Sequence, residues 1–346
     1  MTISQPRVGD RVLELPPVRG PWTDALLRLL TGECDRVAEP ERIRDEVLGD
    51  DDLQMALYLC YELHYAQLDG VDERLEWSPQ VLSFRAALEE RFEAALRELV
   101  DAGRRDEPDP DVRAVTSVGT ELQRLVREDD GPPLSRYFET SATVEQMLEH
   151  VVHRSAYQLK EADPHSWAIP RLTGSVKAAL IEIQADEYGG GRVDRMHSTL
   201  FADTMRGLGL DDRYGAYLDR LPGVTLATVN LVSWLGLHRR LRAALTGHLA
   251  VFEMTSSVPN RRYANGLRRA GFGPDVTGFY DEHVEADAVH ETIAAWDLAD
   301  GLAVSNPELA ADVLFGARAL LALEARWGTH LLQAWGREES SLLRPL

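Results

Sequence analysis

Three side chains that can bind a metal ion lie close together in the segment that ends at His290. His283, Asp287 and His290 are spaced at i, i+4 and i+7, so on a helix they lie on one face. The same face carries Phe279 and Tyr280, which indicates that it is directed toward the core. Buried imidazole and carboxylate groups need a partner, and a metal ion is the simplest one. Two histidines and a carboxylate form a ligand set suited to iron.

A further candidate ligand, Glu187, lies at the end of a helix predicted over residues 172–188. The apolar stripe of this helix includes Ile183, and Glu187 continues the stripe one turn later. A glutamate on the core-facing side is costly to bury alone, so its position favours a role as a ligand. Glu182 and Asp186 lie off the stripe and are weaker candidates.

His197 follows Glu187 by ten residues. On an unbroken helix these two side chains would lie about 15 Å apart and point in different directions. The segment Gly189-Gly-Gly191 lies between them and can break the helix at little energetic cost. We therefore expect this break to direct His197 toward the same metal site.

A third source of ligands is the helix predicted over residues 142–162, which offers two alternatives. Glu161 lies near the end of the helix on a face of mixed polarity. Its neighbours on that face are His150, Arg154, Tyr157 and Gln158. Glu149 and His153 form an alternative pair at i and i+4. The pattern of the residues leaves both alternatives open.

Apolar residues recur at helical spacing along most of the chain, which predicts an all-α fold. The remaining predicted helices span residues 53–65, 79–103, 117–127, 196–207, 226–236, 239–254, 260–269, 274–300 and 307–335. Glycine and proline mark the breaks between them, and no alternating strand pattern or internal repeat is evident.

Two polar stretches, residues 104–111 and 127–133, interrupt the helical pattern. They predict an N-terminal helical extension over residues 1–135 and a helical body over residues 136–346. Neither stretch is long enough for a free linker, so we expect the two parts to pack together.

The composition excludes several classes of protein. A formal net charge of −20 argues against a nucleic-acid partner, because such proteins need a basic surface. Two cysteines without metal-type spacing provide no disulfide framework, which indicates a reducing compartment. The N-terminus lacks an apolar signal core, and the longest apolar run, residues 224–237, is too short to span a bilayer. We therefore expect a cytoplasmic protein that binds neither a membrane nor a nucleic acid.

Three segments together resemble the haem-oxygenase-like diiron oxidases and oxygenases, often called iron-containing redox enzymes. The matching segments are Leu159-Lys-Glu-Ala-Asp-Pro-His165, the run Asp186-Glu-Tyr-Gly-Gly-Gly191 followed by His197, and His283-x3-Asp287-x2-His290. The resemblance covers roughly residues 140–300. It favours Glu161 over the pair Glu149 and His153. The six metal ligands that it implies are Glu161, Glu187, His197, His283, Asp287 and His290.

The same resemblance implies a haem-oxygenase-like helical bundle and a non-haem diiron oxidoreductase. Two iron ions would react with O2 through a peroxo-bridged diferric intermediate. The substrate would be a small molecule, and an external electron donor and a homodimer are also expected. N-oxygenation of an amine or amino-acid-like substrate, as a monooxygenase, is the first expectation; oxidative desaturation or C–C cleavage is the alternative.

The choice of N-oxygenation depends on the N-terminal part. The segment Leu59-Cys-Tyr-Glu-Leu-His-Tyr65 and Trp77 resemble the helical extension of relatives that make N-nitrosoureas. Those relatives carry a further cupin domain, for which this chain ends too soon, so we do not expect their complete reaction.

Three other functions compete with this interpretation. A thiaminase-like enzyme of the same fold would use a cysteine, but Cys34 and Cys60 lie outside the metal-site segments. A haem oxygenase needs one proximal histidine, and the additional carboxylates would crowd a haem. A non-catalytic helical metal-binding protein is the alternative that is not an enzyme. Tyr157, Tyr188 and Tyr280 lie near the ligands in sequence, either as packing residues or as hydrogen-bond partners.

Overall fold

The computed structural model describes residues 11–34, 46–103 and 117–346, and for residues 285–289 it describes only the backbone. Regular structure in these ranges is almost entirely helical, which confirms the all-α prediction. One short parallel pair joins strand β1 (Val12–Leu13) to strand β2 (Gln67–Leu68). The polar stretch 104–111, used above to predict a boundary, lies outside the described residues.

Fifteen α-helices follow one another along the described chain. The first three are α1 (Pro21–Leu30), α2 (Asp51–Glu62) and α3 (Pro79–Gly103). The next six are α4 (Val118–Glu128), α5 (Leu134–Thr140), α6 (Val144–Gln158), α7 (Asp163–Ser166), α8 (Gly174–Glu187) and α9 (His197–Gly207). The last six are α10 (Gly223–Leu237), α11 (Arg242–Met254), α12 (Ser257–Arg269), α13 (Pro274–Thr292), α14 (Gly301–Ser305) and α15 (Ala310–Gly336).

Two predicted helices end earlier than expected. The helix predicted over 142–162 stops at Gln158, and the chain then turns through Ala162, whose φ is +75°. Pro164 has no N–H to bond the carbonyl of Lys160, so an α-helix cannot continue through this point. The helix predicted over 274–300 is α13 followed by a π-helical segment, η9 (Ile293–Asp300). Such segments are uncommon and often lie near functional sites.

The apolar run 224–237 forms α10, a buried helix as predicted. Its one amide side chain, Asn230, donates to the carbonyl of Gln54 at 2.9 Å and to Gln54 Oε1 at 2.8 Å, which satisfies the buried amide nitrogen. Helices α11 and α15 approach each other closely at Gly247, where an added Cβ would lie 1.8 Å from the carbonyl oxygen of Val313. Only glycine allows the two backbones this approach.

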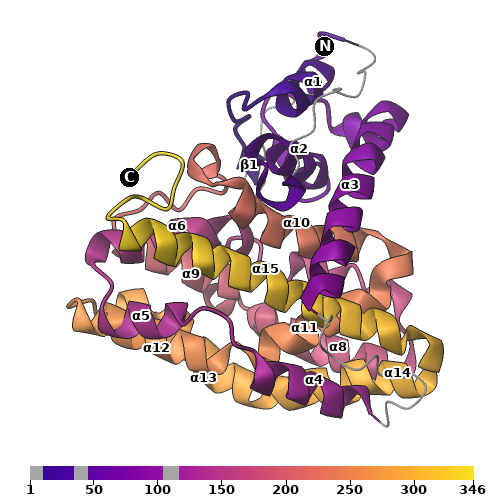
Figure 1. Ribbon diagram of the computed structural model, residues 1–346, viewed down its shortest axis with the longest axis vertical. Helices are drawn as coiled ribbons and strands as arrows, with labels where there is room; N and C mark the ends of the chain where they lie inside the picture. Colours follow the sequence, from indigo (N-terminus) through magenta and orange to yellow (C-terminus); the bar gives the residue numbers. More distant parts are fainter. Residues whose placement is uncertain (1–10, 35–45, 104–116) are drawn as a thin grey trace.

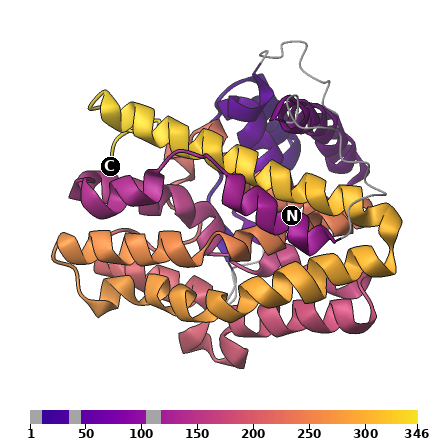
Figure 2. The same cartoon turned by 60° about the horizontal axis from the view of Figure 1, so that its bottom comes forward.

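The N-terminal helices pack on one side of the helical body. Helix α2 packs against α10, and α3 packs against α15, which runs along the body in both views (Figure 1 and Figure 2). Asp52 of α2 accepts hydrogen bonds from the backbone of Trp22 and Thr23, which fixes the start of α1. Helix α4 packs against η9, α11 and α15. None of the helices in the described ranges has the length and apolar composition that a membrane span requires.

Candidate metal centre

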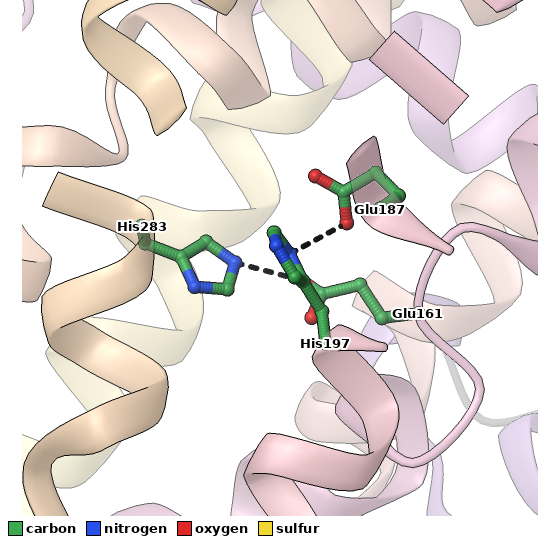
Figure 3. A group of neighbouring side chains, drawn as sticks. All are labelled: Glu161, Glu187, His197 and His283. Carbon is green, nitrogen blue, oxygen red and sulfur yellow. Dashed lines mark ion pairs between the residues drawn. The ribbon is translucent and has the colours of Figure 1, made fainter. Parts of the chain in front are cut away.

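Four buried side chains from four separate parts of the chain lie close together inside the helical body. Glu161 comes from the turn after α6, Glu187 from the last residue of α8, His197 from the first residue of α9, and His283 from α13. One ligand atom from each lies within 4.8 Å of those of the others. Figure 3 shows the four side chains pointing toward one another. We refer to these four residues as the first cluster.

A second cluster adjoins the first and shares one residue with it. Glu187, Glu253 and His290 are all buried, and their ligand atoms also lie within 4.8 Å of one another. Glu253 lies at the end of α11, and His290 lies two turns beyond His283 in α13. Glu187 therefore belongs to both clusters and connects them.

The glycine segment after α8 brings His197 to Glu187. Gly189 has φ of +64°, and an added Cβ would lie 2.6 Å from the carbonyl carbon of Arg195. The chain therefore doubles back over Gly189 before α9 begins. As a result, His197 Nδ1 lies 2.9 Å from Glu187 Oε2. The glycine break thus places His197 beside Glu187, while its role as a metal ligand stays a prediction.

Hydrogen bonds fix the orientation of both histidines in α13. His283 Nδ1 donates to the backbone carbonyl of Phe279 at 2.8 Å, which leaves Nε2 toward Glu161 Oε1 at 3.6 Å. His290 Nε2 lies 3.0 Å from Asp186 Oδ2, and its Nδ1 lies 3.5 Å from Glu253 Oε2. Ligand histidines commonly bond a carbonyl or carboxylate through the other ring nitrogen in this way. Asp186, a weak candidate as a ligand, therefore acts as the residue that orients His290.

The buried nitrogen atoms fit a bound cation. His197 Nδ1 and His290 Nδ1 have no hydrogen-bond partner among the described residues, although carboxylate oxygens lie 2.9 and 3.5 Å away. These nitrogens and oxygens are close to one another without the alignment of a donor and an acceptor. Groups that direct lone pairs at a shared point are suited to a metal ion, and carboxylate with imidazole suits iron.

The electrostatics of the clusters lead to the same conclusion. Burial raises the pKa of Glu161 and of Glu253. Burial also opposes ionisation of Glu187, but the neighbouring rings of His197, His283 and His290 lower its pKa to about 2. Burial opposes protonation of His290, yet Glu253, with Asp186 and Glu187, raises its pKa to about 9. Protons on His197 and His290 thus balance the carboxylates when no metal is bound, and a cation can replace them.

The structure brings together five of the six residues predicted as ligands. The side chain of the sixth, Asp287, lies outside the described residues, although its backbone continues α13 between His283 and His290. Sequence reasoning missed Glu253. The signal was present, because Glu253 is a carboxylate near the end of an otherwise largely apolar helix, as Glu187 is.

The alternative pair on α6 has a different role. Glu149 accepts hydrogen bonds from Trp335 Nε1 at 2.8 Å and from the backbone of Ser341 at 2.9 Å. His153 bonds Thr225 Oγ1 at 2.6 Å. The Glu149 contacts attach the C-terminal segment to α6, the His153 contact attaches α10 to it, and neither residue joins a cluster.

The three tyrosines that lie near the ligands in sequence make different contacts. Tyr157 packs against Phe252 with ring centroids 5.5 Å apart. Tyr188 donates to Asp163 Oδ1 at 2.8 Å and so supports the turn that carries Glu161. Tyr280 lies beside a cavity described below.

Neither cysteine is placed for catalysis. Cys60 is buried in α2, and burial raises the pKa of its thiol to about 12. Cys34 is partly buried, and neither residue lines the cavity or joins a cluster. This arrangement gives no support to a cysteine nucleophile.

A cavity of about 420 Å³ opens beside the first cluster. Glu161 and His283 form part of its wall, together with the aromatic rings of Phe201, Phe252 and Phe279. Cavities of this size accommodate small molecules. The cavity therefore gives a small molecule access to the side of the cluster.

The chain is similar to known proteins in sequence and in fold. A family model described as iron-containing redox enzyme matches residues 148–325. A nitrosourea synthase from Streptomyces achromogenes subsp. streptozoticus is 31% identical over 137 residues, which cover 39% of this chain and 29% of that protein. The crystal structure of a CADD-like protein of unknown function from Nostoc punctiforme superposes with a TM-score of 0.50 at 19% identity, covering 62% of this chain and 96% of the other.

Proposed function

The chain belongs to the family of iron-containing redox enzymes, and on that basis we propose that its two clusters hold two iron ions that react with dioxygen. The fold is haem-oxygenase-like, as expected, and the protein is an oxidoreductase. The observation that carries the proposal of two ions is the position of Glu187, which belongs to both clusters.

In this proposal, Glu161, Glu187, His197 and His283 hold one ion. Glu187, Glu253 and His290 hold the other. Asp287 is proposed as a further ligand because of its place on α13 between the two histidines. When bound, the two ions supply the redox chemistry that activates dioxygen.

The protein's own residues orient the ligands and exclude water. The carbonyl of Phe279 and the carboxylate of Asp186 fix the rings of His283 and His290. Phe201 and Phe279 are almost fully buried at 1% and 2% exposure, and both line the cavity beside the first cluster. A substrate in the cavity would therefore meet the first cluster beside buried aromatic rings.

We propose N-oxygenation of an amine or amino-acid-like molecule as the reaction. Its support is the similarity to the nitrosourea synthase, whose name describes a product with a nitrogen–nitrogen bond. The matched segment is less than a third of that protein, so the reaction of the whole relative is not transferred. Electrons from an external donor would balance insertion of one oxygen atom while the other leaves as water.

Anaerobic titration with ferrous iron, followed by exposure to oxygen, tests the proposal. Two ions bound per chain and an oxygen-dependent change in the visible spectrum are expected. Mass spectrometry of products then separates the reactions, because N-oxygenation adds oxygen whereas desaturation removes two hydrogens. Saturation at one ion per chain, or no reaction with oxygen, would contradict the proposal.

The predicted division at residue 135 and the expected homodimer also remain proposals, and we propose that the dimer forms through the N-terminal extension. Trp77 in this part is 65% exposed, and a large exposed aromatic side chain is typical of an interface. Light scattering of the whole chain and of a Trp77→Glu variant tests the dimer, which should dissociate in the variant.

A further inference from the structure

The turn that carries Glu161 contains a strained residue. Residues 160–163 form this turn between α6 and α7, and the N–H of Asp163 donates to the carbonyl of Lys160 at 3.1 Å. Ala162, the third residue of the turn, has φ of +75°. Glycine is usual at a positive φ in this position, because an alanine Cβ is crowded there. Strained residues of this kind persist only where the surrounding structure holds them, and they often lie at functional sites.

The first and last residues of the turn both form ion pairs with the N-terminal part of the chain. Lys160 pairs with Glu62 of α2, and neither side chain has solvent-accessible surface. Asp163 pairs with Arg11, which directly precedes β1, at a partly buried site. The two ion pairs therefore flank Glu161 in the sequence, and each reaches a different element of the N-terminal part.

The two N-terminal partners are themselves held in place. The carbonyl of Arg11 accepts from the N–H of Gln67 at 2.9 Å, beside the β1–β2 pair. Glu62 Oε2 accepts from the hydroxyl of Tyr214 at 2.6 Å. Ion pairs between flexible surface side chains contribute little, but a pair whose members are fixed by further bonds can fix the backbone that carries them.

The helical body holds the same turn from α8. Gln184 Nε2 donates to the carbonyl of Ala162 at 2.8 Å, and Gln184 lies three residues before Glu187 on that helix. The conformation of the turn therefore sets the position of Glu161 relative to Glu187, the other carboxylate of the first cluster.

We propose that Arg11 and Glu62 are positioning residues for the metal centre. Through Asp163 and Lys160 they hold the strained turn in the conformation that directs Glu161 into the first cluster. This inference rests on the proposed function, because it takes Glu161 as an iron ligand. It deepens that function by giving the N-terminal part of the chain a role in iron binding.

Two variants each remove one of the ion pairs. Arg11→Met removes the partly buried pair, and the double variant Glu62→Leu with Lys160→Met removes the buried pair without leaving an unpaired charge. We expect each variant to bind iron about tenfold more weakly in an anaerobic titration, the effect typical of changes to residues that support ligands. Arg11→Met alone decides the test if the double variant does not fold.

Hydrogen exchange of the iron-free, whole chain provides a readout that does not depend on the metal. The N–H of Asp163 is protected by the hydrogen bond that closes the turn. Its exchange should be faster in both variants, because the turn opens more often once an ion pair is lost.

A rescue experiment separates positioning from a merely structural role. Adding Ala162→Gly to Arg11→Met should restore the iron affinity to within about threefold of the unaltered chain, because glycine adopts a positive φ without strain. A merely structural role predicts no restoration, since glycine replaces none of the lost contacts. Ala168→Gly is the matched control: both alanines are 1% exposed, but Ala168 has φ of −75°, so its replacement relieves no strain and should restore nothing.

A second control removes a contact between the N-terminal part and the body that lies away from the turn. Asp51 Oδ1 of α2 accepts from the N–H of Gly223, the first residue of α10, at 2.6 Å. Asp51→Ala should keep the iron affinity of the unaltered chain, because it leaves both ion pairs of the turn intact.

Three results would overturn the inference: Arg11→Met and the double variant bind iron like the unaltered chain, Ala162→Gly restores no affinity, or Asp51→Ala weakens binding as much as Arg11→Met does. If the chain binds two ions and reacts with oxygen but the variants bind them equally well, only the positioning role is rejected. If the unaltered chain takes up no iron, the proposed function fails. Hydrogen exchange at Asp163 then decides by itself whether the N-terminal part holds the turn, and unchanged exchange in the variants rejects that as well.

Discussion

Lys160 and Glu62 form an ion pair with no solvent-accessible side-chain surface, one residue before the proposed ligand Glu161. Glu62 also accepts from Tyr214 Oη at 2.6 Å, and the Lys160 ammonium lies 4.3 Å from the ring centroid of Tyr65. Glu62 belongs to α2, so the N-terminal helices are attached directly to the turn that carries Glu161.

Removing one member of this pair should greatly lower the free energy of unfolding. Glu62→Leu leaves a buried ammonium without its partner, and we expect a loss of about 3–5 kcal/mol in the free energy of unfolding, measured with denaturant. The double variant Glu62→Leu with Lys160→Met should recover most of that loss, because no buried charge remains. Glu93→Gln, which breaks exposed ion pairs with Arg97 and Arg240, is the control and should cost about 1 kcal/mol or less.

Glu253 should be necessary for one ion only. In Glu253→Gln the second cluster loses a carboxylate, while all four residues of the first cluster remain. We expect iron titration to saturate at one tightly bound ion. The affinity for the other ion should fall by more than about 100-fold, which is the upper range for changes to residues that only support ligands. Glu182→Gln on the exposed face of α8 is the control. Two tight ions in Glu253→Gln would reject Glu253 as a ligand.

The proposed ligands on α13 can be tested within one helix. Asp287→Ala and His290→Ala should each reduce bound iron and abolish oxygen-dependent turnover, while far-UV circular dichroism stays close to that of the unaltered chain. Asp281→Ala is the matched control, because Asp281 lies on the same helix and pairs with Arg268 at a half-exposed site. Normal iron content in both ligand variants would show that the site is wrongly assigned.

The pKa of His290 predicts a pH dependence of stability in the iron-free protein. Its pKa is about 9 in the folded chain, against 6.5 for an ordinary histidine. The protonated ring therefore stabilises the fold fully below pH about 6.5, and this contribution is lost as the pH rises through about 9. The melting temperature of iron-free protein should fall over this range, with a smaller fall in His290→Gln. Iron affinity should rise over the same range, because the ion no longer competes with a proton.

The close approach of Gly189 to the backbone of Arg195 should be as important for iron binding as any one of the proposed metal ligands. Gly189→Ala introduces a left-handed residue, at about 1–2 kcal/mol, and also places Cβ against the backbone of Arg195. We expect His197 to move away from Glu187 and iron binding to be lost. Gly190→Ala separates the two effects, since Gly190 has φ of +60° but no atom within 4 Å of an added Cβ. Gly190→Ala should therefore keep its iron.

Much of the helical framework is determined by local sequence. The predicted bounds of α3 agree with the structure, and the buried helix α10 was recognised from its apolar run. The core-facing positions of Glu187, His283 and His290 were also found, because each interrupts an apolar stripe that repeats within a single helix. The break at Gly189 was found because a glycine can adopt positive φ values at its own position, which needs no information from distant residues.

Contacts between helices were decided only by the tertiary structure. Glu253 reaches His290 from another helix, and Asp186 lies off its own apolar stripe yet bonds that same ring. The cavity wall joins Arg154 to Glu324, which are far apart in the chain. Periodicity describes which face of a helix is buried, but the packing of one helix against another determines which residues on those faces meet.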